Sequence, residues 1–251
     1  METKHSEYHY KSEKSDTVIV FVHGIQGSPL QFDFLIETLK ESYSIENLLL
    51  PGHGKTVREF IKSNIVQWQS YVDERVEKLQ EEYKNIILVG HSMGCLLSVQ
   101  SAITNPQNIR GLFLIAMPLN IHISYPFIKN NLIVAFSKND RTEIIAAARN
   151  GNSISASNPF KYLGGAPRYV ELLKKSKTKR EHFKKLELPM IIVQSANDEI
   201  VSNKFLHHVE KMHNIKVVIA SNSGHYFYSQ EAKEHISKIL MDFIAEMTKG
   251  C

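Results

Sequence analysis

Short apolar runs rich in Val, Ile and Leu recur along this chain of 251 residues, and turn-forming residues soon follow each of them. Runs that are apolar on both faces are typical of strands in a parallel sheet that is covered on both sides. We expect such strands at residues 17–22, 86–89, 111–115, 190–193 and 216–220, with a weaker candidate at 45–50. Residues 8–11 suit a short antiparallel strand that precedes them.

Stretches with the period of an α-helix lie between these runs. Four apolar residues between 32 and 39 are spaced at i, i+3, i+4 and i+7, and similar stripes lie within 71–83 and 232–247. The alternation of strands and helices predicts βαβ units. The expected fold is therefore α/β, with a mostly parallel, doubly wound sheet of about seven strands.

About seventy residues between Ala116 and Pro189 break this alternation. The stretch is too long for a bare loop, and it contains helix-like pieces at 128–136 and 141–149. We expect an inserted helical cap, or lid, at 118–187 on a core made of 1–117 and 188–251. Apolar residues of this cap could line an acyl pocket or form the cap's own core; they are Tyr125, Phe127, Ile128, Leu132, Ile133 and Phe136.

The composition excludes several classes of protein. Apolar residues make up 43% and charged residues 22%, which excludes disordered, collagen-like and disulfide-scaffold chains. The apolar runs are too short to span a membrane, and the polar start of the chain does not resemble a secretory signal. Two distant cysteines, Cys95 and Cys251, suggest reduced thiols. We therefore expect a cytoplasmic protein.

The net charge of +4 is concentrated in one basic run. Residues 174–185 hold seven Lys or Arg and one Glu, so the rest of the chain is slightly acidic. The run could be a solvated helix face, it could attract an anionic substrate, or it could make a weak contact with an anionic membrane surface through Lys174, Lys175, Lys177, Lys179 and Arg180. Nothing else indicates nucleic-acid binding, and the pattern does not indicate an oligomeric state.

A G-x-S-x-G motif is the strongest chemical signal. It runs from Gly90 to Gly94, directly after the expected strand 86–89 and directly before a helical stretch at 93–104. A tight strand-to-helix turn of this kind needs glycine on both sides and exposes a nucleophilic serine, Ser92, at the carboxyl edge of the sheet. The N-terminus of the following helix favours developing negative charge at the same place.

A second glycine-containing turn, His23 to Gly27, follows the expected strand 17–22 at the same edge. A tetrahedral intermediate needs two preorganised N–H donors beside the nucleophile. Met93, next after the serine, supplies one of them. Ile25, just after Gly24, is our choice for the other, and the sequence leaves Gln26 open as its rival.

An acid and a base complete the set. Asp198 follows the expected strand 190–193, and its neighbour Glu199 is the rival carboxylate. His225 follows the expected strand 216–220. We predict that His225 accepts the proton of Ser92 and that Asp198 orients the imidazole ring. The histidines at 207, 208 and 213 lack Cys or carboxylate partners at ligand spacing, so we expect no metal.

These motifs resemble the α/β-hydrolase superfamily. The chain order Ser92, Asp198, His225 is that of this superfamily. Within it the chain looks like the bacterial carboxylesterase and monoacylglycerol-lipase group, which is serine aminopeptidase S33-like and lysophospholipase-like. The matching pieces are FVHGIQGSP, LLLPGHG, LVGHSMG, SANDEIV and SGH, spread from about residue 17 to 245. The resemblance implies hydrolysis of carboxylic esters without a cofactor, beneath a cap.

The expected activity is that of a carboxylic ester hydrolase acting through an acyl-enzyme on Ser92. Short- to medium-chain acyl esters or monoacylglycerols are the expected substrates, because the predicted cap is apolar and no charged anchor is evident. Two alternatives stay open. The same three residues could serve a thioesterase, an acyltransferase or a carbon–carbon hydrolase, or the chain could be a non-catalytic binding protein with a hydrolase fold.

Overall fold

A computed structural model describes residues 5–122, 125, 142–154, 161, 164–183 and 186–249, with the backbone alone for 177–183, 205 and 208. The described chain forms one seven-stranded sheet in the order β1-β3-β2-β4-β5-β6-β7. All neighbouring strands are parallel except β1, which pairs antiparallel with β3. The strands are β1 (Tyr8–Tyr10), β2 (Thr17–Val22), β3 (Ser44–Leu48), β4 (Asn85–His91), β5 (Ile109–Ile115), β6 (Met190–Ser195) and β7 (Ile215–Ala220).

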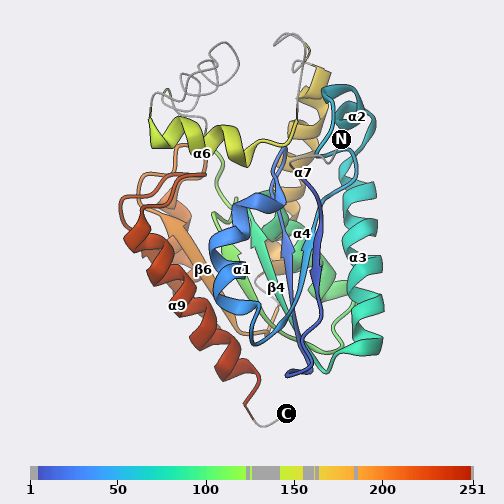
Figure 1. Ribbon diagram of the computed structural model, residues 1–251. Coiled ribbons are helices and arrows are strands. Elements are labelled where there is room, and N and C mark those ends of the chain that lie inside the picture. The colour runs from blue at the N-terminus through green and yellow to red at the C-terminus, as the bar shows by residue number, and fades with distance from the viewer. Residues whose placement is uncertain are drawn as a thin grey trace.

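Helices cover both faces of the sheet (Figure 1). A 3-10 turn, η1 (Pro29–Phe32), leads into α1 (Asp33–Leu39), which packs with α9 (Gln230–Met247) on one face. The other face carries α3 (Ile65–Glu82), α4 (Met93–Thr104) and the short α8 (Leu206–Val209). A second short helix, α2 (Val57–Lys62), precedes α3, and a 3-10 turn, η3 (Asn203–Phe205), precedes α8.

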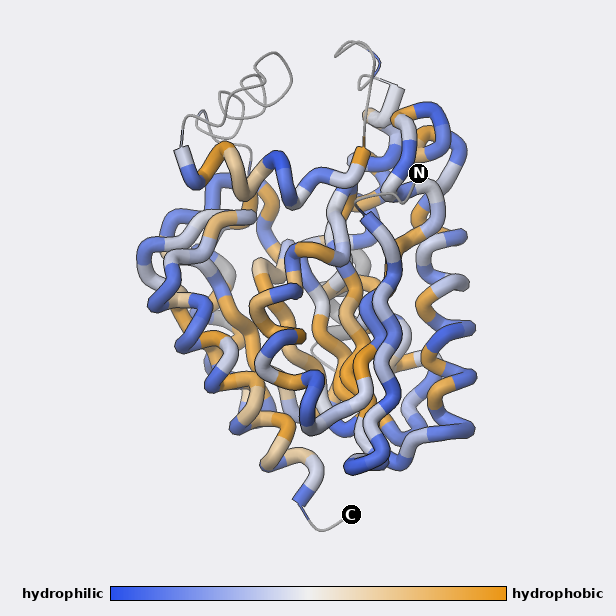
Figure 2. Tube along the Cα trace, in the orientation of Figure 1, coloured by the Kyte–Doolittle hydropathy of each residue, from blue (hydrophilic) through white to orange (hydrophobic). Residues whose placement is uncertain are grey.

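The period-2 alternation of β2 explains the two apolar layers. Val18, Val20 and Val22 belong to the cluster on the α3–α4 side, and Ile19 and Phe21 belong to the cluster on the α1–α9 side. Figure 2 shows apolar residues gathered along the central strands and the inner sides of the helices. The predicted α/β class, the sheet of about seven strands and the antiparallel first strand are therefore confirmed.

Two helices of the predicted cap region lie in the described part of the chain. They are α6 (Glu143–Gly151), which crosses the carboxyl edge of the sheet at the top of Figure 1, and α7 (Ala166–Phe183). Ile154 and Leu172 are buried in the same apolar cluster as the α3–α4 face. The helix-like piece 128–136 and five of the six apolar cap residues lie outside the described residues, and Tyr125 is 75% exposed. The cap boundaries stay a prediction.

Sequence periodicity did not predict α2 and α8, because they have six and four residues and so carry less than two turns of apolar pattern. Within the described residues, no helix combines the length and the apolar character that crossing a membrane requires.

Candidate active site

Ser92 is the single residue between the end of β4 and the start of α4. Its backbone has φ 52° and ψ −119°, a conformation that L-residues seldom adopt. A Cβ added at Gly90 would lie 2.6 Å from the Cys95 N, and one added at Gly94 would lie 1.9 Å from the Val22 O. The backbone therefore leaves no room for a side chain on either side of this turn.

The loop from His23 to Gly27 lies directly beside Ser92. A Cβ added at Gly24 would be 3.0 Å from the Ser92 Cβ and 3.3 Å from the His91 carbonyl oxygen. The loop closes on itself through a 2.9 Å hydrogen bond from the Gly27 N–H to the Gly24 carbonyl oxygen. The close approach of Gly24 to Ser92 therefore places the turn that follows β2 against the turn that follows β4.

Of the two amides that the sequence left open, one is already engaged. The Gln26 N–H donates to Nε2 of His53 at 3.1 Å, and Gln26 itself has φ 54°. Among the described residues, neither the Ile25 N–H nor the Met93 N–H donates to a partner. These two amides are therefore free to donate to a substrate.

Two buried histidines support this loop. His23 donates from Nδ1 to the Gly24 carbonyl oxygen at 2.8 Å and accepts from the Leu50 N–H through Nε2 at 3.0 Å. Burial lowers the pKa of His23 to about 4 and lowers the pKa of His53 well below its ordinary value, where the nearby His23 adds to the effect. Both rings are therefore neutral near pH 7, which leaves one nitrogen of each able to accept a backbone N–H.

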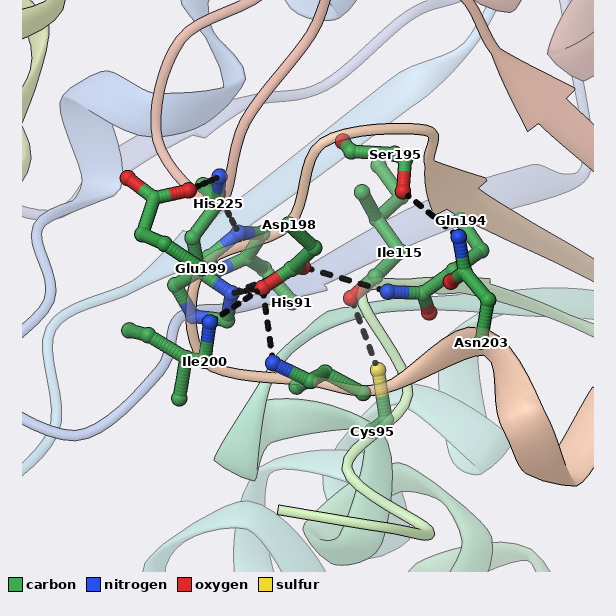
Figure 3. Close-up of polar contacts among 11 residues, drawn as sticks. His91, Cys95, Ile115, Gln194, Ser195, Asp198, Glu199, Ile200, Asn203 and His225 are labelled. Carbon is green, nitrogen blue, oxygen red and sulfur yellow. Dashed lines mark hydrogen bonds and ion pairs between the residues drawn. The ribbon is translucent and has the colours of Figure 1, made fainter. Parts of the chain in front are cut away.

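The side chain of Asp198, which follows β6, is fully buried and accepts hydrogen bonds from four donors (Figure 3). Its Oδ1 accepts from the Ile200 N–H at 2.9 Å and the Val201 N–H at 2.8 Å, and its Oδ2 accepts from Nε2 of Gln194 at 3.1 Å. Nδ1 of His225 lies 3.0 Å from Oδ2 and 3.1 Å from Oδ1.

The electrostatics of Asp198 favour its ionised form. Burial by itself raises the pKa of this carboxyl group, but His225 and the two backbone N–H donors outweigh that effect. The pKa of Asp198 therefore lies below its ordinary value, and the carboxylate is charged at neutral pH.

Glu199, the rival carboxylate, contacts the backbone of His225 and not its ring. Oε2 of Glu199 accepts from the His225 N–H at 2.8 Å, and Nε2 of His91 donates to the His225 carbonyl oxygen at 2.9 Å. The His225 backbone is held from both sides, so the residue just before Ser92 also anchors the histidine loop. Sequence reasoning did not assign this contact to Glu199, since a loop carboxylate carries no local signal for it.

The remaining predicted site features are only partly described. Lys175 of the basic run donates from Nζ to Oε1 of Gln69 at 2.7 Å, and the side chains of 177–185 lie outside the described part. Contact of this run with a membrane surface stays a prediction. The described residues contain no group of three or more His, Cys, Asp or Glu side chains that could hold a metal ion.

The arrangement of these side chains and amides is suited to acyl transfer. A serine in a tight turn, two free amides beside it, and a histidine oriented by a buried carboxylate are the parts of an acyl-transfer site. One hydrogen bond joins His91, the neighbour of Ser92, to the His225 backbone, and another joins the His225 ring to Asp198. The catalytic roles of Ser92, His225 and Asp198 stay a prediction.

Comparison with known proteins adds a family and a set of relatives. A family model described as serine aminopeptidase, S33, matches residues 13–219. Phospholipase YtpA of Bacillus subtilis is 29% identical over 211 residues, which cover 76% of this chain and 80% of that protein. A dihydrolipoyllysine-residue acetyltransferase component of the acetoin cleaving system of Cupriavidus necator is 28% identical over 109 residues. That match covers 43% of this chain, which spans only 28% of the length of that relative.

A solved structure from work on two metagenome-derived lipolytic enzymes has the same fold. Its TM-score to this chain is 0.75 with 20% sequence identity, and the match covers 98% of this chain and 99% of the other. At this identity the likeness concerns the fold, and it agrees with the superfamily that the motifs resemble.

Proposed function

Because this chain belongs to the serine aminopeptidase S33 family of α/β-hydrolases, we propose that it is a serine carboxylesterase acting through an acyl-enzyme on Ser92. One observation carries the proposal. The His225 ring is hydrogen bonded to the buried Asp198, while the His225 backbone is bonded to His91, which immediately precedes Ser92. The loop that carries the base is thus hydrogen bonded to the residue that precedes the nucleophile.

Acylation begins with proton transfer from Ser92 to Nε2 of His225. Oγ of Ser92 attacks the ester carbonyl carbon, and the carbonyl oxygen becomes an oxyanion. The charged Asp198 holds Nδ1–H of the ring, which leaves Nε2 free as the acceptor and stabilises the imidazolium cation. His225 then returns the proton to the leaving alcohol. Water repeats the same steps on the acyl-enzyme and releases the carboxylic acid.

The amides of Ile25 and Met93 stabilise the oxyanion in this scheme. The Gln26 amide is the rival of Ile25, but its bond to His53 makes it unavailable to a substrate. Met93 opens α4, so the helix N-terminus adds its positive end to the same spot. Two donors in a site of this kind are worth several kcal/mol of transition-state stabilisation, about 3–4 kcal/mol for each donor.

Short- to medium-chain acyl esters or monoacylglycerols are the proposed substrates. The apolar composition of the stretch expected to form the cap supports an acyl ligand. One relative is named a phospholipase and the solved neighbour comes from work on lipolytic enzymes, which agrees with a carboxylic ester as the scissile bond.

Acyl transfer is the second candidate function. One partial relative is named an acetyltransferase component, and an acyl-enzyme can donate its acyl group to an alcohol or thiol as well as to water. Thioester hydrolysis uses the same residues. A non-catalytic binding protein is the third candidate, and it would bind ligand equally well with or without the Ser92 hydroxyl.

The test is hydrolysis of p-nitrophenyl esters from acetyl to palmitoyl, with Ser92→Ala as the control. We expect turnover with an optimum at short to medium chains, and a loss of about 10⁴-fold or more in kcat for the variant. Added alcohol should change product partition only if acyl transfer contributes. Equal inactivity of both proteins toward all esters would contradict esterase function, and thioesters would be tested next.

A further inference from the structure

Residues 151–154, which end α6 and follow it, lie across the loops at the carboxyl edge of the sheet. Nε2 of Gln31 donates to the Gly151 carbonyl oxygen at 3.3 Å, and a Cβ at Gly151 would be 2.9 Å from the Tyr226 ring. Ile154 is 5% exposed and belongs to the same apolar cluster as Ile25. The strap formed by residues 151–154 therefore contacts the turn after β2 and the loop that carries His225.

Ser153 makes the most specific contacts of this strap. Its backbone N–H donates to the Gln26 carbonyl oxygen at 2.9 Å, and its hydroxyl donates to the Gly27 carbonyl oxygen. The same hydroxyl accepts from the Gly54 N–H at 3.1 Å. Ser153 is 4% exposed, so these bonds are shielded from water. One side chain thus joins the 23–27 loop to the loop that contains His53.

Both backbone polar groups of Gln26, its N–H and its carbonyl oxygen, are hydrogen bonded. His53 accepts its N–H, and Ser153 donates to its carbonyl oxygen. Gln26 has φ 54°, a left-handed conformation that is unfavourable for a residue other than Gly and persists only where neighbours impose it. The preceding Ile25 amide shares this backbone, so its direction depends on the same restraints.

We propose that Ser153 is a positioning residue for the oxyanion hole, because its hydroxyl holds the 23–27 loop with the Ile25 N–H directed at the carbonyl oxygen of a substrate on Ser92. The inference rests on the proposed function. It also goes beyond it, since it assigns part of the transition-state stabilisation to a residue from the inserted region, which does not touch the reacting atoms.

The chain offers a matched pair of variants. Ser153→Ala removes the hydroxyl and leaves the backbone bond to Gln26. Ser176→Ala removes an equally buried hydroxyl of α7, which donates to the Pro118 carbonyl oxygen instead of the 23–27 loop. Each variant loses a buried hydroxyl that donates to a backbone carbonyl oxygen, and Ser153→Ala also loses the acceptor of the Gly54 N–H, so urea unfolding of both variants is measured beside kcat to separate a loss of stability from a loss of positioning.

For Ser153→Ala we expect kcat to fall about 10-fold to 100-fold with KM within about twofold, because a displaced donor weakens transition-state binding selectively. The midpoint of the kcat/KM pH profile should not move, since the bond between His225 and Asp198 is untouched. Ser176→Ala should keep kcat within about twofold. Ser153→Thr keeps the hydroxyl and should stay within about threefold of wild type.

Deuterium uptake of a peptide covering residues 23–28 provides a readout that does not need turnover. The Gln26 and Gly27 N–H groups are both hydrogen bonded, so a loosened loop exchanges faster. We expect faster uptake in Ser153→Ala than in wild type, and no change in Ser176→Ala.

Three results would overturn the inference: unchanged uptake in Ser153→Ala, an equal kcat loss in both alanine variants, or a Thr variant as impaired as the Ala variant. Failure of the proposed function looks different, because wild type and Ser92→Ala would then be equally inactive. The uptake comparison still decides in that case whether Ser153 holds the loop.

Discussion

At the level of single residues, Asp198 is held by hydrogen-bond donors on both of its carboxylate oxygens. Both of its oxygens accept hydrogen bonds from N–H donors, and two of these come from rigid backbone amides at Ile200 and Val201. A group in this position must accept on every side. The donors therefore explain why a carboxylate is needed here, even though an amide has the same shape.

Replacing Asp198 with Asn should lower kcat by about 10⁴-fold with little change in fold. The amide oxygen would be retained by the backbone donors, which would turn the amide N–H₂ toward Nδ1 of His225. The ring would then carry its proton on Nε2 and could not accept one from Ser92. Ester turnover and circular dichroism measure the two effects separately.

Glu199→Gln is the matched control for that variant, because Glu199 bonds the His225 backbone N–H and its amide oxygen can still accept it. We expect less than about a tenfold loss in kcat. A similar loss in both variants would mean that the ring tautomer is not what Asp198 controls.

At the scale of elements, the approach of α4 to β2 is set by one missing side chain. Gly94 lies in the first turn of α4, and its Cα faces the carbonyl oxygen of Val22 at the end of β2. The helix can come this close only where no Cβ intervenes. The same contact brings Met93, and with it the helix N-terminus, next to the 23–27 loop.

Gly94→Ala should destabilise the protein by about 3 kcal/mol or more, because the added Cβ would lie 1.9 Å from a backbone oxygen that cannot rotate away. Helix propensity alone predicts the opposite sign, a gain of about 1 kcal/mol. Urea unfolding measures the difference. Gly165→Ala is the control, since its Cβ would meet the edge of the Phe60 ring at 3.1 Å, and it should cost far less.

At the scale of the whole molecule, three buried histidines make folding depend on pH. Burial lowers the pKa of His23 to about 4 and of His91 to about 3, and it lowers that of His53 in the same direction. In the unfolded chain these groups titrate near about 6.5. Between those values the unfolded state binds more protons than the folded state. The contribution of these histidines to the free energy of unfolding is therefore fully present above about pH 6.5 and is lost as the pH drops.

The free energy of unfolding should therefore fall by roughly 3 kcal/mol between pH 6 and pH 5, since each group contributes up to about 1.4 kcal/mol per pH unit. Asp198 adds to the loss only below about pH 3.9, because its own pKa is lowered from there. Urea unfolding at each pH measures the slope. His91→Gln should reduce the slope by about a third. A wild-type free energy of unfolding that stays constant from pH 7 to pH 5 would contradict the role of the buried histidines.

The exposed His213 provides the control for this pH series. Its side chain is 82% exposed, so His213→Gln removes one histidine and leaves the three buried ones in place. An equal effect of both substitutions would show that burial is not the cause.

Local sequence patterns were enough to predict the strands and the tight turn at 90–94. Runs such as 17–22 and 190–193 became strands because burial on both faces demands apolar residues throughout, a property of each short segment. The tight turn around Ser92 was predictable for a similar reason, since its backbone leaves room only for glycine at 90 and 94. The carboxyl ends of parallel strands also meet at one edge, which predicted that Asp198 and His225 would lie together.

Contacts that join distant parts of the chain were not predictable from local patterns. Asp198 and Glu199 are adjacent and chemically alike, and the register of the loop against His225 determines which one reaches the ring. The bond that engages the Gln26 N–H joins it to His53, 27 residues away, and the bond from Ser153 to Gly27 spans 126 residues of sequence. Local patterns report the burial and turn geometry of a segment, but hydrogen bonds between loops depend on packing, which no local pattern records.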